Sequence, residues 1–310
     1  MAILTSIVIP VLSLVAVFLF GIEKFSRHIR KMADGRFKSA LRKLTRNPLG
    51  GLALGAIFTA LIQSSTATTV ILAGLANAGI VSFQQSMGII LGANIGTTIT
   101  SQLIALKVTN IAPYFILLGF LITYFGRERK SWGKPIFYFG LVFFSISLIS
   151  LYIEPVRTNP EILNLFGKVS NLFIAILVGF LFTSIVQSSS VTSGLVVVLA
   201  GSGLLDLNQA FGIILGANLG TTVTVILASL MLNFEAQRVA LAHFLFNLLG
   251  ILILIPFLNE FLLPISNLGI GVAQKVAVAH ISFNLIFALL FLLLVKPFSN
   301  LVCRVIPARK

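Results

Sequence analysis

Gln63-Ser64-Ser65-Thr66 and Gly92-Ala93-Asn94-Ile95-Gly96-Thr97-Thr98 are the two most informative stretches of this chain, because each occurs twice. Their second copies are Gln187-Ser188-Ser189-Ser190 and Gly216-Ala217-Asn218-Leu219-Gly220-Thr221-Thr222. Both belong to one longer match, in which Gly55–Thr100 aligns with Gly179–Thr224 without a gap, at an offset of 124 residues and with 22 of 46 positions identical. A duplicated unit that places Gln, Ser, Thr and Asn in an apolar chain is typical of secondary transporters.

The composition of the chain is that of a protein embedded in a lipid bilayer. Of its 310 residues, 57% are hydrophobic and 10% are charged, and the mean hydropathy is +1.06, whereas soluble proteins carry about 25% charged residues. Helices of about 20 apolar residues cross a hydrocarbon core, and the alternation of a β-barrel is absent from the sequence. We therefore predict an all-α polytopic membrane protein with spans at Ile3–Ile22, Met87–Leu106, Ile111–Phe125, Ile136–Ile153, Ala210–Leu230, Ala236–Leu258 and Val272–Val295.

The net charge of +14 comes from basic residues gathered between the predicted spans. Nine of the 22 basic residues fall between Lys24 and Arg46, four between Arg127 and Lys134, and four between Lys296 and Lys310. The positive-inside rule accounts for such clusters, so nucleic acid is not an expected partner. The single cysteine, Cys303, excludes an intrachain disulfide and a thiolate metal site. We expect no transition metal and no cofactor, and no nucleophile–base pattern indicates an enzyme.

The basic clusters also predict how the two copies are oriented. When all three clusters are placed in the cytoplasm, a hairpin at 49–83 enters the membrane from the inside and a hairpin at 171–205 enters from the outside, which makes the copies inverted-topology repeats. The localisation that we expect is the cell inner (plasma) membrane, crossed several times. The predicted organisation is a first membrane helix with a basic interfacial segment (1–48), a first repeat (49–153), an external linker (154–169), a second repeat (170–295) and a basic cytoplasmic tail (296–310).

Each hairpin carries a polar segment at its centre, Gln63–Thr66 in the first copy and Gln187–Ser190 in the second; we call these the QSS segments. The apolar arm on either side is too short to cross a bilayer easily, so we predict a re-entrant helical hairpin that reverses there. Irregular backbone at membrane depth is tolerated where it lines a water-filled cavity. Helix N-termini carry about half a positive charge and bind anions, and neither hairpin contains a basic residue.

The second duplicated stretch, Gly92–Thr98 and Gly216–Thr222, places two glycines around an asparagine; we call these the GAN segments. Glycine weakens a helix, so we predict a discontinuous helix whose freed carbonyls join Asn and Thr oxygens around a cation. Neutral oxygens suit an alkali ion, because divalent ions prefer carboxylates and all eight acidic residues lie outside the duplicated motifs. A proton-coupled carrier needs a titratable group within the membrane. Sodium is therefore the favoured coupling ion.

Two other interpretations of the polar residues stay open. Small and hydroxylated residues also occur where membrane helices pack closely, although packing alone does not require Gln and Asn at matched places. A weaker echo pairs His243 and Asn247 with His280 and Asn284, each pair on one helix face. For these residues interhelical hydrogen bonds are favoured over substrate contact or proton relay.

The paired Gln-Ser-Ser-Ser/Thr motifs, each followed by Gly-x-Asn-x-Gly-Thr-Thr, and the Ala-His-x-x-Phe-Asn helices resemble the type II sodium/phosphate cotransporters and their bacterial relatives, from about Leu14 to Leu294. The resemblance implies uptake of inorganic phosphate with sodium by alternating access. It implies a phosphate site of Gln63, Ser64, Ser65, Thr66, Gln187, Ser188, Ser189 and Ser190. It implies sodium ligands among Ser65, Thr66, Asn94, Thr97, Thr98, Gln187, Ser189, Ser190, Asn218, Thr221 and Thr222.

Other functions remain alternatives at this point. A sodium-coupled carrier of another small oxyanion or carboxylate would use the same helix ends, because these discriminate poorly between anions. An ion channel would need a continuous polar pore, and a structural membrane protein would use the polar segments for packing alone. The expected partners are phosphate, sodium and the lipid bilayer. The oligomeric state is open, with a homodimer as one candidate.

Overall fold

A computed structural model describes residues 7–44, 47–126, 130–157, 159–167, 169 and 171–308. These residues form helices and connecting turns, and no strand occurs in the described ranges. The α-helices are α1 (Ile9–Leu44), α2 (Pro48–Ile62), α3 (Ser65–Asn77), α4 (Phe83–Thr97), α5 (Ile99–Ala105), α6 (Ala112–Phe125), α7 (Lys130–Ile153), α8 (Pro160–Gly167), α9 (Leu172–Val186), α10 (Ser189–Gly201), α11 (Leu207–Ser229), α12 (Phe234–Leu254), α13 (Leu258–Ser266), α14 (Val272–Leu293) and α15 (Val295–Val305). Three short 3-10 helices join some of them: η2 (Val108–Ile111), η4 (Glu154–Val156) and η5 (Ile255–Phe257).

Six of the seven predicted spans are confirmed as helical stretches long and apolar enough to cross a membrane. For the first, Ile3–Ile22, this holds from Ile9 onward, and residues 3–6 lie outside the described residues. The helices α2, α9 and α10 are apolar but shorter, as expected for the arms of the two hairpins. The seven long stretches are Ile9–Ala33, Phe83–Ala105, Val108–Phe125, Lys130–Ile153, Leu207–Ser229, Phe234–Ser266 and Val272–Leu293.

The helix breaks predicted at the QSS segments are present in both copies. The first helix of each pair ends at Ile62 or at Val186, and the next residue, Gln63 or Gln187, has left-handed backbone angles with φ of 57° and 59°. Left-handed backbone is uncommon for residues other than glycine and is found at functional sites that over-determine it. After one further residue in extended conformation the chain enters α3 or α10. Whether the hairpins are re-entrant in a membrane remains a prediction.

The GAN segments differ from the prediction. In the second copy, α11 runs without interruption from Leu207 to Ser229, so the predicted discontinuous helix is wrong there. In the first copy only Thr98 separates α4 from α5, and its backbone stays in the right-handed helical region at φ −67° and ψ −18°. The low helix propensity of glycine favours unwinding here, but the close packing of these glycines against a second helix outweighs that preference.

The glycines of the GAN segments bring two helix backbones into contact. A Cβ atom built on Gly92 or on Gly216 would lie less than 3.0 Å from backbone atoms of the facing helix, closer than real Cβ atoms come. Gly92 meets α2 at Leu52, and Gly216 meets α9 at Ile176. Glycine at every fourth position is the small-residue spacing that lets membrane helices approach closely. The same tight contact recurs at Gly55, Gly88, Gly96, Gly179 and Gly220.

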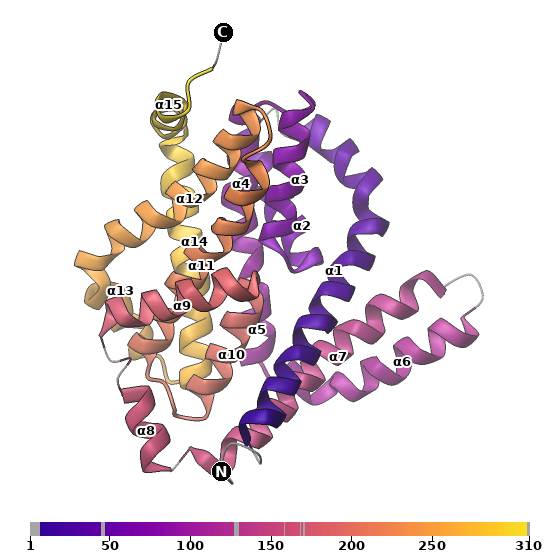
Figure 1. Cartoon of the computed structure of the whole chain (residues 1–310), viewed down its shortest axis with the longest axis vertical. Helices are drawn as coiled ribbons and strands as arrows, with labels where there is room; N and C mark the ends of the chain where they lie inside the picture. The colour runs from indigo at the N-terminus through magenta and orange to yellow at the C-terminus, as the bar shows by residue number, and fades with distance from the viewer. Residues whose placement is uncertain are drawn as a thin grey trace.

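The helix pairs from the two halves of the chain interlock. Helix α2 lies along α4 and α9 lies along α11, while α3 packs against α11 and α12, and α10 packs against α5 and α14. As Figure 1 shows, α6 and α7 extend together to one side, and α1 crosses the molecule beside α7. The predicted first span and the predicted interfacial segment form one helix, α1, of 36 residues. The two QSS segments are thereby held at the centre, beside the middle of α1.

Candidate functional site

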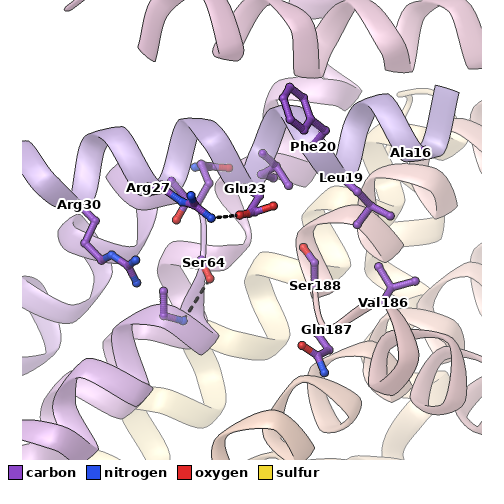
Figure 2. A pocket seen from close by; sticks show the side chains of 14 residues that line it. Ala16, Leu19, Phe20, Glu23, Arg27, Arg30, Ser64, Val186, Gln187 and Ser188 are labelled. Atoms are coloured by element: carbon purple, nitrogen blue, oxygen red, sulfur yellow. Dashed lines mark hydrogen bonds and ion pairs between the residues drawn. The ribbon is translucent and has the colours of Figure 1, made fainter. Parts of the chain in front are cut away.

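Both QSS segments line one cavity of about 660 Å³, although 124 residues separate them in sequence. Gln63 and Ser64 contribute the wall from the first copy, and Gln187 and Ser188 contribute the wall from the second. Helix α1 passes over Ser64 and Ser188 and forms one wall of the cavity, as Figure 2 shows. The structure thus brings together four of the predicted phosphate-site residues.

The first QSS segment is tightly held by hydrogen bonds. Gln63 is only 7% exposed, and its side-chain amide donates to the Ala60 carbonyl at 2.5 Å. The Thr100 hydroxyl donates to Gln63 Oε1. Ser64 caps α3, because its hydroxyl oxygen accepts the Ala67 N–H at 3.1 Å. The polar groups of this segment are therefore largely committed to the protein itself.

The second QSS segment has the same backbone but none of these side-chain bonds. Gln187 is exposed to the cavity, and its side chain forms no hydrogen bond with any described residue. Ser188 begins α10 without capping it. Thr224, the counterpart of Thr100, has a buried hydroxyl without a hydrogen-bond partner among the described residues. The amide of Gln187 and the Ser188 hydroxyl, both at the cavity wall, are thus available to a ligand.

A direct hydrogen bond joins the two QSS segments. The Ser190 hydroxyl donates to the Gln63 carbonyl across the centre of the molecule at 3.2 Å. Each segment is also braced within its own copy by a threonine pair: Thr59 and Thr68 share a bond of 2.8 Å, and Thr183 and Thr192 share one of 2.6 Å. The identical bracing at matched positions accounts for the matching backbone of the two breaks.

The remaining predicted phosphate-site residues do not line the cavity. Ser65, Ser189 and Ser190 are buried behind it, with 4%, 4% and 2% exposure, and Thr66 is half-buried outside the lining. These residues form the first turns of α3 and α10.

The six predicted sodium ligands of the GAN segments are all buried and lie away from the cavity lining. Asn94 Nδ2 donates to the Ile90 carbonyl at 2.9 Å, whereas Asn218 Nδ2 has no partner. Each of the four threonine hydroxyls donates its hydrogen to a carbonyl of its own helix, which leaves the oxygen lone pairs unused. These bonds are Thr97 to Ala93 at 3.0 Å, Thr98 to Ile95 at 2.7 Å, Thr221 to Ala217 at 3.1 Å and Thr222 to Leu219 at 2.6 Å.

The echoed His and Asn residues are fully buried in α12 and α14. The predicted interhelical hydrogen bond is confirmed for His280, whose Nδ1 lies 3.0 Å from the Ser101 hydroxyl of α5. Within the described residues, neither ring nitrogen of His243 has a hydrogen-bond partner. Each asparagine donates to the carbonyl of the histidine four residues before it, at 2.9 Å. None of these four residues lines the cavity.

Sequence reasoning missed the charged residues of the cavity. Glu23, Arg27 and Arg30 of α1 line it together with the QSS segments. Their spacing of four and three residues puts them on one helix face, and that periodicity is visible in the sequence. A helix that lies at a membrane surface has the same periodicity, and the sequence predicts that role for this segment. Thr100 was missed too, although its identity with Thr224 lies inside the duplicated stretch.

The chain is similar to several known proteins. A family model described as Na+/Pi-cotransporter matches residues 17–151 and 160–295. The "Uncharacterized protein YqeW" of Bacillus subtilis is 33% identical over 307 residues, which cover 98% of this chain and 99% of that protein. The "Putative inorganic phosphate export protein YjbB" of Escherichia coli is 28% identical over 253 residues, or 80% of this chain and 46% of that protein.

A shorter and closer match joins the chain to an animal protein. The "Sodium-dependent phosphate transport protein 2C" of Mus musculus is 48% identical over 101 residues, which are 30% of this chain and 16% of that protein. This chain thus spans less than half the length of YjbB and a small part of the mouse protein. No solved structure matches the chain. Since the family model covers both copies of the duplicated motif and the match to YqeW runs end to end, the chain belongs to the Na+/Pi-cotransporter family.

Proposed function

We propose that this protein is a sodium-coupled transporter of inorganic phosphate that works by alternating access in the cell membrane. The observation that carries the proposal is the cavity, whose walls come from both QSS segments and whose two sides are joined by the Ser190–Gln63 bond. Membership of a transporter family supports transport of phosphate. The duplicated sequence supports two inverted repeats that meet at this cavity.

The donors at the cavity suit an oxyanion. Gln187 and Ser188 offer an amide N–H₂ and a hydroxyl, and they lie at the N-terminus of α10, the positive end of its helix dipole. A tetrahedral phosphate accepts hydrogen bonds from several directions at once. We assign the phosphate site to the two QSS segments, with the second copy as the open side.

For sodium we propose the oxygens that lie behind the cavity. The four threonine hydroxyls of the GAN segments already donate their hydrogens, so only lone pairs face outward, and a cation binds lone pairs. The neutral character of these oxygens suits an alkali ion. We propose ligands among Ser65, Thr66, Asn94, Thr97, Thr98, Gln187, Ser189, Ser190, Asn218, Thr221 and Thr222.

A second cavity is consistent with access from the other side. It measures about 370 Å³, lies between α5, α7 and α10, and contains neither QSS segment. The elements that surround it lie toward the lower end of the molecule in Figure 1. In an alternating-access cycle, the QSS segments would open to this cavity when they close to the larger one.

Labelled phosphate uptake into proteoliposomes tests the coupling. An inward sodium gradient should accelerate uptake, and replacing sodium by choline should remove the acceleration. Uptake that is indifferent to sodium would refute the coupling. Competition by sulfate, arsenate and dicarboxylates separates phosphate from the other small anions, and large unitary currents in single-channel recordings would favour a channel.

Export is the second candidate, because the name of the relative YjbB describes export. A symporter moves phosphate in the direction of the sodium gradient, and reversing the gradient should reverse the flux. Net phosphate movement against the sodium gradient, in vesicles of known orientation, would support export instead of uptake.

A further inference from the structure

One face of α1 supplies all the charge that lines the larger cavity. The face consists of Glu23, Arg27 and Arg30, and no other acidic or basic residue lines the cavity in the part of the chain that the structure describes. Figure 2 shows the three side chains on the side of α1 that faces the QSS segments. The duplicated hairpins themselves contain no basic residue, so the positive side-chain charge at the cavity comes from this helix.

The two arginines are not equivalent. Arg27 forms an ion pair with Glu23, whose side chain is 58% exposed. Arg30 has no ion pair or hydrogen bond with any described residue, and its side chain is exposed. The three residues together carry a net charge of about +1, and that charge is available at Arg30 because Arg27 is largely neutralised by its partner.

The cavity geometry points to a role for this charge that we propose as new: Arg30 binds the oxyanion beside the QSS segments, and Glu23 tunes the binding through Arg27. A guanidinium presents a fork of N–H donors that matches two oxygens of a phosphate. Charge at the wall of a cleft also raises the local concentration of an oppositely charged ligand. The inference rests on the proposed function in taking phosphate as the anion.

Positive-inside placement alone does not account for this arrangement. Lys24 and Lys31 belong to the same basic segment, yet neither lines the cavity, and Lys24 lies over the Phe20 ring at 5.1 Å. If the segment only served membrane orientation, neighbouring basic residues would be interchangeable. Lys31, one residue beyond Arg30 and on another helix face, is therefore a matched control.

A charge series at constant fold tests the inference. Binding of labelled inorganic phosphate to the purified protein in nanodiscs, at fixed sodium, is measured for Glu23→Gln, Arg30→Gln, Arg30→Lys and Lys31→Gln. Arg30→Gln should raise the Kd about fivefold, roughly the effect of one unit charge about 4 Å away in water. Glu23→Gln should lower the Kd by a similar factor, because it frees Arg27.

The controls separate charge from structure. Lys31→Gln should leave the Kd unchanged, and Arg30→Lys should bind more tightly than Arg30→Gln. The differences in Kd between the variants should become smaller in 1 M choline chloride, where charges are screened beyond about 3 Å. Equal Kd values for Arg30→Gln and Lys31→Gln, or weaker binding in Glu23→Gln, would overturn the inference.

The outcomes also distinguish this inference from the proposed function. Sodium-driven uptake together with equal Kd values for all the charge variants would refute the role of Arg30 and leave the proposed function intact. A graded series of Kd values without sodium-driven uptake would keep the anion site and refute the coupling. Absence of phosphate binding to the unsubstituted protein would refute both.

Discussion

Replacing Thr100 and Thr224 by valine should have opposite effects on stability, although the two residues occupy matched positions of the duplication. The Thr100 hydroxyl donates to the buried Gln63 side chain, whereas the Thr224 hydroxyl is buried without a partner. Valine has nearly the shape of threonine, so packing is conserved in both variants. The contrast isolates one hydrogen bond.

The magnitudes follow from the environment of each hydroxyl. Thr100→Val leaves Gln63 Oε1 buried without that donor, which costs about 1–3 kcal/mol. Thr224→Val removes a hydroxyl that is already unsatisfied, so the free energy of unfolding should stay the same or rise by about 1 kcal/mol. With Tm changes of about 2–4 °C for each kcal/mol in domains of about 150–250 residues, Thr100→Val should lower the Tm by about 2–12 °C.

Thermal unfolding of the purified variants, followed by circular dichroism in one detergent, measures both effects. Combining Gln63→Leu with Thr100→Val should recover part of the loss, because both partners are then apolar. Equal destabilisation by the two valine substitutions would refute the reasoning. Under alternating access, Thr224→Val should also slow phosphate transport while it preserves or raises the Tm, because Gln187 loses the partner that it would bond in the opposite state.

Three further predictions concern packing and the cavity. Gly216→Ala should destabilise the protein by about 1–3 kcal/mol, because the new Cβ would meet the backbone of α9. The control Gly74→Ala has nothing within 4 Å of the new Cβ and should be neutral or stabilising. The Tm values of the two variants check this contrast. Gln187→Ala should abolish phosphate uptake at an unchanged Tm, while Gln63→Ala should abolish uptake and lower the Tm, since only Gln63 is buried and hydrogen-bonded. Ser190→Ala should cost about 0.5–1.5 kcal/mol of stability through loss of the bond between the QSS segments, and a Tm equal to that of the unsubstituted protein would contradict that role.

The spans and the helix breaks could be predicted because each depends on local sequence. Apolar runs of sufficient length give spans, and the polar residues of Gln63–Thr66 interrupt such a run at the point where α2 ends. The GAN segments misled the prediction, because glycine has two opposed effects in a membrane helix. It weakens an isolated helix, but at every fourth position it also permits the backbone contact that holds α11 straight against α9.

Two features of the site could not be predicted from local sequence. The Gln63 side chain is hydrogen-bonded, whereas the Gln187 side chain has no hydrogen bond with any described residue, although the two segments are nearly identical in sequence. The contrast therefore arises from tertiary contacts and not from the local sequence. The arginines of α1 follow a helical period that is equally typical of a surface helix. Only the tertiary arrangement, which places α1 across the QSS segments, distinguishes Arg30 from Lys31.

The backbone contacts along α2–α4 and α9–α11 have a mechanical consequence. Side chains between two helices can change rotamer and let the helices slide, but helices that touch through glycine have almost no such freedom, because interiors are close-packed and do not deform continuously. Each pair should therefore move as a stiff rod. Bending is then expected at the left-handed residues Gln63 and Gln187, so the residues proposed to bind phosphate would also be the hinges of the two hairpins.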